Sequence, residues 1–106
     1  MQLGRTEKRV LASQRLAELF RRHGYTRRQN RARLAEEGYL RYKKGDEVRL
    51  IAESEAELTT IRRLLRQAGF RAGRPFAKGR RFWQPVYGRE AVRRFLGMVR
   101  DHSDRS

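Results

Sequence analysis

Apolar residues recur at intervals of three and four along three stretches of the chain, a spacing typical of helices that bury one side. These stretches cover residues 6–23, 54–68 and about 89–100. The first has Thr6 as its expected N-cap and Gly24 after its last turn. The expected buried stripes are Ala12, Leu16, Leu19 and Phe20 in the first; Leu58, Ile61, Leu64, Leu65 and Ala68 in the second; and Ala91, Val92, Phe95, Leu96 and Val99 in the third.

The second of these helices has the clearest boundary signals. Ser54 and Glu57 form a capping box, in which the Ser54 side chain accepts from the Glu57 amide and Glu57 reaches back. Gly69 follows the last turn and Phe70 comes next, an order typical of a Schellman ending. Both ends of this helix are therefore predicted from local chemistry.

A fourth helix is expected over residues 27–37, with Thr26 as its cap and Gly38 at its end. Its apolar residues are few, while arginines crowd it. This pattern indicates either a surface helix or a helix that lies against phosphates. The residues concerned are Ala32, Leu34 and Ala35 among the apolar ones, and Arg27, Arg28, Arg31 and Arg33 among the cations.

Two segments alternate between apolar and polar residues and are predicted to form β-hairpins. The first covers residues 39–52, with turn chemistry at residues 44–46. The second has arms at residues 70–76 and 80–87, joined by residues 77–79. Pro75 and Pro85 are expected at strand ends or on an edge, because proline cannot donate to a ladder. In the return arm Phe82, Gln84 and Val86 should point one way, and Arg81, Trp83 and Tyr87 the other.

These elements predict an α+β fold in which the two hairpins form a four-stranded antiparallel sheet. The helices pack on one face of the sheet, and an extra helix stands at the N-terminus. Residues 1–100 form a single basic α+β domain, and residues 101–106 a frayed tail. The other face of the sheet is then left with mostly Arg and Lys residues.

The charge of the chain changes what that exposed face means. The 106 residues carry 27 Lys and Arg against 12 Asp and Glu, a formal net charge of +15, and 23 of the 27 cations are Arg. Arginine presents a planar fork of donors that matches phosphate oxygens and stacks on bases. Releasing counterions from a polyanion favours binding to such a surface. The balance therefore favours a nucleic-acid partner, with DNA preferred to RNA.

Composition also excludes several classes of protein. The chain has no Cys, which rules out a disulfide scaffold and thiolate metal sites, and its two His are far apart in sequence. No apolar run reaches the ~20 residues of a membrane span and no signal peptide opens the chain, so we expect a cytoplasmic protein that does not bind membranes. We also find no nucleophile elbow, P-loop or paired His, and predict no cofactor, metal or catalytic residue.

The best candidate site is the basic, aromatic-rich sheet face with its hairpin tips. No acidic residue occurs between Glu57 and Glu90, and aromatic residues are interleaved with the cations there. Trp83 beside Arg81 joins a stacking surface to a donor fork, which suits a groove or an unpaired strand. The predicted nucleic-acid-binding residues are Arg41, Lys43, Arg49, Arg71, Arg74, Lys78, Arg80, Arg81 and Trp83.

A secondary basic patch is predicted at Arg27, Arg28 and Arg31. Cations at these helical positions repel one another unless a polyanion is near. A helix, a turn at Gly24 and Tyr25, and an Arg-rich helix also suit a helix-turn-helix, with residues 39–52 as a wing. A winged-helix DNA-binding regulator is therefore an alternative.

The order of elements also resembles a known family. The segment 34–40, the hairpin to Ala52, the capped helix, the second hairpin and the last helix look like one αββαββα unit of the LAGLIDADG homing endonucleases. The resemblance covers residues ~30–100 and implies a saddle-shaped sheet that lies in the major groove of DNA. It also implies that Glu37, just before Gly38, occupies the position of the family's metal-binding acid.

The signature helix of that family departs from its pattern in this chain. Residues 30–33, with the sequence Asn-Arg-Ala-Arg, replace the small and apolar residues through which two such helices pack. We therefore expect a non-catalytic nucleic-acid-binding protein, monomeric or homodimeric, more than a nuclease. Two further alternatives stay open: a divergent metal-dependent nuclease that uses Glu37 and Mg²⁺, and a protein-interaction module with an acidic partner.

Overall fold

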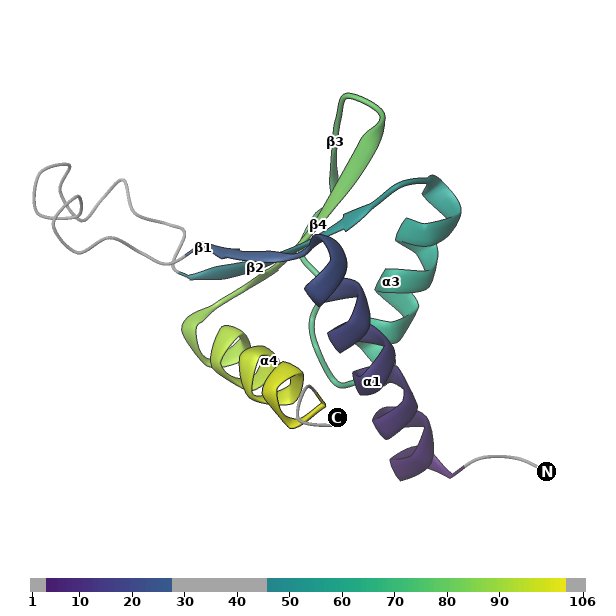
Figure 1. Cartoon of the computed structure of the whole chain (residues 1–106), viewed down its shortest axis with the longest axis vertical. Helices are drawn as coiled ribbons and strands as arrows, with labels where there is room; N and C mark the ends of the chain where they lie inside the picture. Colours follow the sequence, from purple (N-terminus) through teal and green to yellow (C-terminus); the bar gives the residue numbers. More distant parts are fainter. Residues whose placement is uncertain (1–3, 28–45, 103–106) are drawn as a thin grey trace, which may run out of the picture.

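The computed structural model describes residues 4–27 and 46–102, and within them three helices and four strands. In chain order the elements are α1 (Arg5–His23), β1 (Tyr25–Arg27), β2 (Glu47–Ala52), α3 (Glu55–Gln67), β3 (Phe76–Lys78), β4 (Arg81–Tyr87) and α4 (Arg89–Asp101). Figure 1 shows these elements along the chain.

The strands form one antiparallel sheet in the order β1-β2-β4-β3, with α1, α3 and α4 on one side of it (Figure 1). The central pair is β2 with β4, in which Leu50 lies opposite Gln84 and Val48 opposite Val86. The predicted α+β class, the four-stranded antiparallel sheet and the N-terminal helix are therefore confirmed. The β3–β4 hairpin extends beyond the helices (Figure 1).

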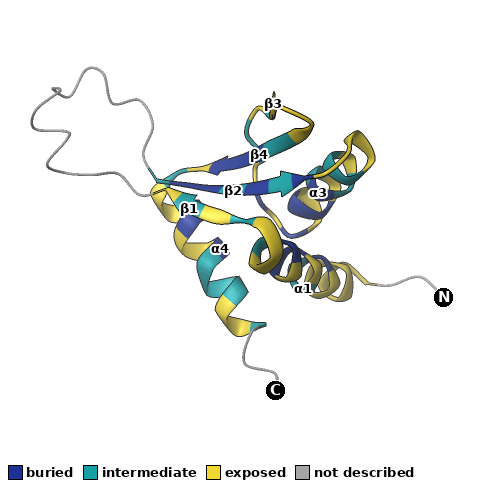
Figure 2. Ribbon diagram, turned by 45° about the horizontal axis from the view of Figure 1, so that its top comes forward, coloured by how far each residue is buried: buried dark blue, intermediate teal, exposed yellow. Residues whose placement is uncertain are grey.

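The core lies between the helices and the central strands, where Figure 2 shows most of the buried residues. Phe95 of α4 is fully buried and meets two other rings edge to face, Phe20 at 5.4 Å and Phe70 at 5.3 Å between centroids. Edge-to-face pairs stabilise beyond the area that they bury. The predicted stripes supply this core, since Leu16, Ile61, Leu65, Val92 and Phe95 are all buried.

A fully buried glutamine joins α3, β4 and the preceding loop. The Gln84 amide nitrogen donates to the carbonyls of Gly73 and Pro85, each at 2.8 Å. The Gln84 side-chain oxygen accepts from Arg62 Nη1 at 2.7 Å, and Arg62 Nη1 also donates to the Gly73 carbonyl at 3.1 Å. Because buried polar groups cost stability unless they are paired, this network fixes the loop before β3 against β4.

Both predicted ends of α3 are present. Ser54 Oγ accepts from the Glu57 amide at 3.1 Å, whereas the Glu57 carboxylate accepts from the amide of Glu53 rather than that of Ser54. At the other end Gly69 has a φ of 86°, and the Phe70 amide donates to the Leu65 carbonyl at 2.8 Å, as in a Schellman motif.

Two predictions near the N-terminus are wrong. The N-cap of α1 is Gly4, whose amide donates to the Glu7 carboxylate, and Thr6 lies inside the helix. Thr26 and Arg27 belong to β1 and do not open a helix, because β2 offers them a ladder of partners. The remainder of the expected helix 27–37 and the strand at 39–43 lie outside the described residues.

The second hairpin also differs in detail from its prediction. Lys78 is paired with Arg81, so the turn consists of Gly79 and Arg80 instead of residues 77–79. The φ of 65° at Gly79 suits the first turn position of a type II′ hairpin, a conformation open to glycine. Pro85 lies inside β4 and not at its end. β3 begins only at Phe76, opposite Trp83, so on that side of β4 the Gly73 amide donates to the Pro85 carbonyl instead.

Candidate nucleic-acid interface

The sheet face opposite the helices, called here the open face, carries every second residue of each strand. Alternation and register place the apolar residues Val48, Leu50 and Val86 toward the helices. They leave the following residues on the open face: Tyr25 and Arg27 of β1; Glu47, Arg49 and Ile51 of β2; Arg81, Trp83, Pro85 and Tyr87 of β4; and Phe76 and Lys78 of β3. The predicted orientation of β4 is therefore confirmed.

A buried ion pair occupies the centre of the open face. Arg49 Nε and Nη2 donate to the two carboxylate oxygens of Glu47 at 3.0 and 3.2 Å, and Nη1 donates to the Tyr25 hydroxyl at 3.1 Å. Glu47 is only 3% exposed, and Arg27 Nη1 lies 3.8 Å from its carboxylate oxygen Oε1. Arg49 was predicted to contact nucleic acid, but its donors are already engaged within the molecule.

The charge of Arg49 is fixed by these contacts. Burial by itself lowers the pKa of its guanidinium, but the hydrogen bonds to Glu47 and Tyr25 outweigh burial and raise the pKa above its ordinary value. Arg49 therefore stays protonated, and its positive charge is balanced on the spot by the carboxylate of Glu47.

Aromatic rings surround this ion pair. The Arg49 guanidinium lies 5.9 Å from the ring centroid of Tyr25 and 5.2 Å from that of Phe76. Phe76 in turn stacks on Trp83, with centroids 6.0 Å apart and ring planes 15° from parallel. Tyr25, Phe76 and Tyr87 are 37%, 37% and 40% exposed, whereas Trp83 is half-buried. The centre of the open face is thus aromatic, with little net charge.

The free cations lie around this centre and on the adjoining hairpin. Arg71, Arg74, Lys78 and Arg80 are exposed, and none has a carboxylate partner within the described part of the chain. Arg81 is half-exposed and lies 3.3 Å from Glu53. We call Arg71, Arg74, Lys78 and Arg80 the hairpin cations.

The predicted site residues that the structure describes lie at three places. The hairpin cations, with Arg81 and Trp83, lie on the hairpin and its flanking loop, while Arg49 lies at the sheet centre. Arg27 of the secondary patch lies on the edge strand β1. Arg28, Arg31, Glu37, Arg41 and Lys43 lie outside the described residues.

Sequence reasoning missed Tyr25 as a member of this face and read it as a turn residue. The available signal was Gly24, which ends α1 and permits a strand to start at the next residue. Arg62 lies in the same acid-free stretch of the sequence as the hairpin cations, but its side chain turns away from them and donates to Gln84.

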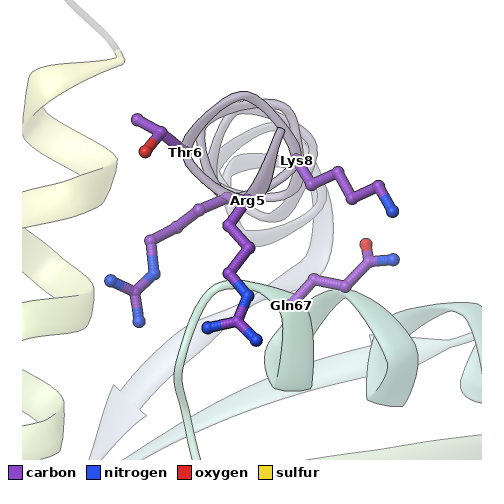
Figure 3. Close-up of a pocket in the computed structure, with 5 residues that line it drawn as sticks. Arg5, Thr6, Lys8 and Gln67 are labelled. Atoms are coloured by element: carbon purple, nitrogen blue, oxygen red, sulfur yellow. The ribbon is translucent and has the colours of Figure 1, made fainter. Parts of the chain in front are cut away.

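A second basic surface lies away from the sheet, between α1 and α3. Figure 3 shows Arg5 and Lys8 of α1 beside Gln67 of α3, around a shallow hollow that Thr6 and Arg9 also line. Among the described residues no acidic side chain lines this hollow, and no buried polar side-chain atom lacks a hydrogen-bond partner. It is a solvated basic surface.

Comparisons of the chain with protein-family models, with curated proteins and with solved structures found no match. Within residues 4–27 and 46–102, no three His, Asp or Glu side chains gather as they do around a metal ion. Of the helices described, none is both long and apolar enough to span a bilayer.

Proposed function

We propose that the protein binds nucleic acids through the open face and the β3–β4 hairpin. The observation that carries this proposal is the set of four exposed hairpin cations, which have no carboxylate partner among the described residues, beside an aromatic sheet face. Exposed guanidinium and ammonium groups of this kind neutralise phosphates and release counterions.

The distribution of charge supports the same proposal. The net charge of +15 creates self-repulsion in a folded protein of this size, and a polyanion relieves it. At the sheet centre the cation Arg49 is neutralised by Glu47, whereas the hairpin cations are left to solvent. The phosphate contacts that we propose are therefore those of the hairpin and the rim, and Arg49 is not among them.

The test replaces Lys78 and Arg80 together with Ala and measures the affinity for labelled DNA and RNA over a series of salt concentrations. Each lost phosphate contact is expected to make the slope of log K against log salt shallower by about 0.7–0.9. The free energy of unfolding should change by less than about 0.5 kcal/mol, because both side chains are exposed.

A matched control removes two charges from the opposite side of the molecule. Arg63 and Arg66 are exposed on α3, behind the sheet, and the Arg63→Ala, Arg66→Ala variant has the same net charge as the test variant. It should keep the wild-type salt slope. Equal slopes for the two double variants would remove the hairpin from the interface.

A further inference from the structure

The open face has a centre that suits bases better than phosphates. A chain of contacts crosses all four strands, from Tyr25 of β1 to Arg49 of β2, on to Phe76 of β3 and Trp83 of β4. Ile51, which is half-buried, lies beside Trp83 in the register of β2 and β4, whereas Pro85, opposite Arg49, is fully buried and does not reach the surface. The centre therefore presents rings and aliphatic carbon to an incoming partner.

A duplex is a poor partner for such a centre. Its surface consists of phosphates and of polar base edges in the grooves, which need hydrogen-bond donors or cations. Arg49 is the central cation, but its Nε, Nη1 and Nη2 groups already donate to Glu47 and Tyr25. A duplex laid on this centre loses water from its polar groups and gains few hydrogen bonds in exchange.

Unpaired bases fit the same surface, because every base has a π-face that stacks on an aromatic ring. The platform is also held in place before binding: Arg49 lies against two of the rings and is itself fixed by a carboxylate that is 3% exposed. A preorganised platform gives up little conformational entropy when a ligand stacks on it.

Two exposed cations of the hairpin tip lie close enough to contact the phosphates of a nucleic-acid strand whose bases stack on this platform. Lys78 follows Phe76 by two residues on the same side of β3, a step of about 6.6 Å along a strand. Arg80 follows in the turn. A base stacked near Phe76 and Trp83 thus leaves its phosphates beside the two side chains of the hairpin tip.

Resting on the nucleic-acid-binding function above, we propose that the open face selects single-stranded nucleic acid, with unpaired bases stacked on the Phe76–Trp83 pair and phosphates at the hairpin tip. The substrate class is a flexible strand with accessible bases, in which the phosphates supply affinity and stacking distinguishes unpaired from paired strands.

The experiment uses three ligands of equal length: a single-stranded oligonucleotide, an abasic strand with the same phosphates, and a duplex. Trp83 is the only tryptophan in the chain, so its fluorescence reports stacking directly. We expect the base-containing strand to quench Trp83 and to bind most tightly, and the abasic strand to bind more weakly without quenching.

Variants separate the two contributions. Trp83→Leu should weaken binding of the base-containing strand roughly 5- to 150-fold, the range of one stacked base, and leave the abasic strand unchanged. Phe76→Leu, on the projecting hairpin, serves the same purpose should Trp83→Leu unfold the sheet. Phe82→Leu is the matched control, because Phe82 is the neighbouring ring on the side of the helices.

The outcomes distinguish failure of single-strand selection from failure of nucleic-acid binding itself. Tighter binding of the base-containing strand, with quenching that Phe82→Leu keeps, supports stacking. Equal affinity for the base-containing and abasic strands, or a preference for the duplex, overturns single-strand selection while nucleic-acid binding stands. Absence of binding to all three ligands overturns both.

Discussion

Both the centre of the open face and the tip of the β3–β4 hairpin carry cations, but the central cation is paired with a carboxylate and the cations at the tip are exposed to solvent. At the centre, Arg49 donates to both carboxylate oxygens of Glu47, and the carboxylate is 3% exposed. At the tip, Lys78 and Arg80 are exposed and lack carboxylate partners in the described part of the chain.

Desolvation explains the difference. A guanidinium that loses water at the sheet centre costs free energy unless a carboxylate replaces the lost hydrogen bonds, whereas a cation at the tip keeps its water. The count of arginines in a segment therefore does not give the number available to a ligand. The available number depends on which of them the fold has already paired.

The largest expected effect comes from breaking the central pair. Replacing Glu47 with Gln leaves Arg49 charged and mostly buried without a counter-charge. Loss of one partner of a buried pair is strongly destabilising, and since Arg49 keeps some exposure we expect the free energy of unfolding to fall by about 2–4 kcal/mol. Urea denaturation followed by circular dichroism measures the change.

Glu53→Gln is the matched control for that prediction. Glu53 pairs with Arg81, but the two side chains are 47% and 51% exposed, and exposed pairs contribute about 0.2–1 kcal/mol. Equal destabilisation by the two substitutions would show that the sheet centre does not differ from its rim.

The next effect in size is expected from the polar network behind the sheet. Gln84→Leu removes one of the two acceptors of Arg62 Nη1 and two hydrogen bonds to loop and strand carbonyls, at a cost of about 1–3 kcal/mol. A double-mutant cycle with Arg62→Met measures the coupling, and the double variant should lose less stability than the sum of the two single ones. Additive losses would mean that the two side chains act independently.

Local signals made much of this fold predictable. The ends of α3 follow from Ser54, Glu57 and Gly69, because capping depends on residues within one turn. The orientation of β4 follows from alternation, which needs only that one side of the strand is buried. The class of the fold follows from the order of these elements.

Features set by distant residues were not predictable in the same way. β1 has three residues, and its pairing with β2 decides that Thr26 extends a sheet instead of capping a helix. Arg62 looks equivalent to Arg71 in the sequence, yet its acceptors Gln84 and Gly73 are brought to it by the fold. The Arg49–Glu47 pair, by contrast, could have been predicted from the sequence, since residues two apart in a strand share a face.

The smallest effect on stability is expected from Glu53→Gln, which should also increase the affinity for nucleic acid. Glu53 holds Arg81 at the border between the aromatic centre and the hairpin cations, so Glu53→Gln should free Arg81 for a phosphate while costing less than about 1 kcal/mol of stability. Affinity for nucleic acid should rise at low salt, and the salt slope should steepen by about 0.7–0.9 if one phosphate contact is added.

Glu55→Gln is the matched control, because Glu55 is exposed two residues away and its removal changes the net charge equally. A gain specific to Glu53→Gln assigns Arg81 to the interface; equal gains from both variants attribute the change to net charge alone and leave Arg81 as a rim residue paired with Glu53.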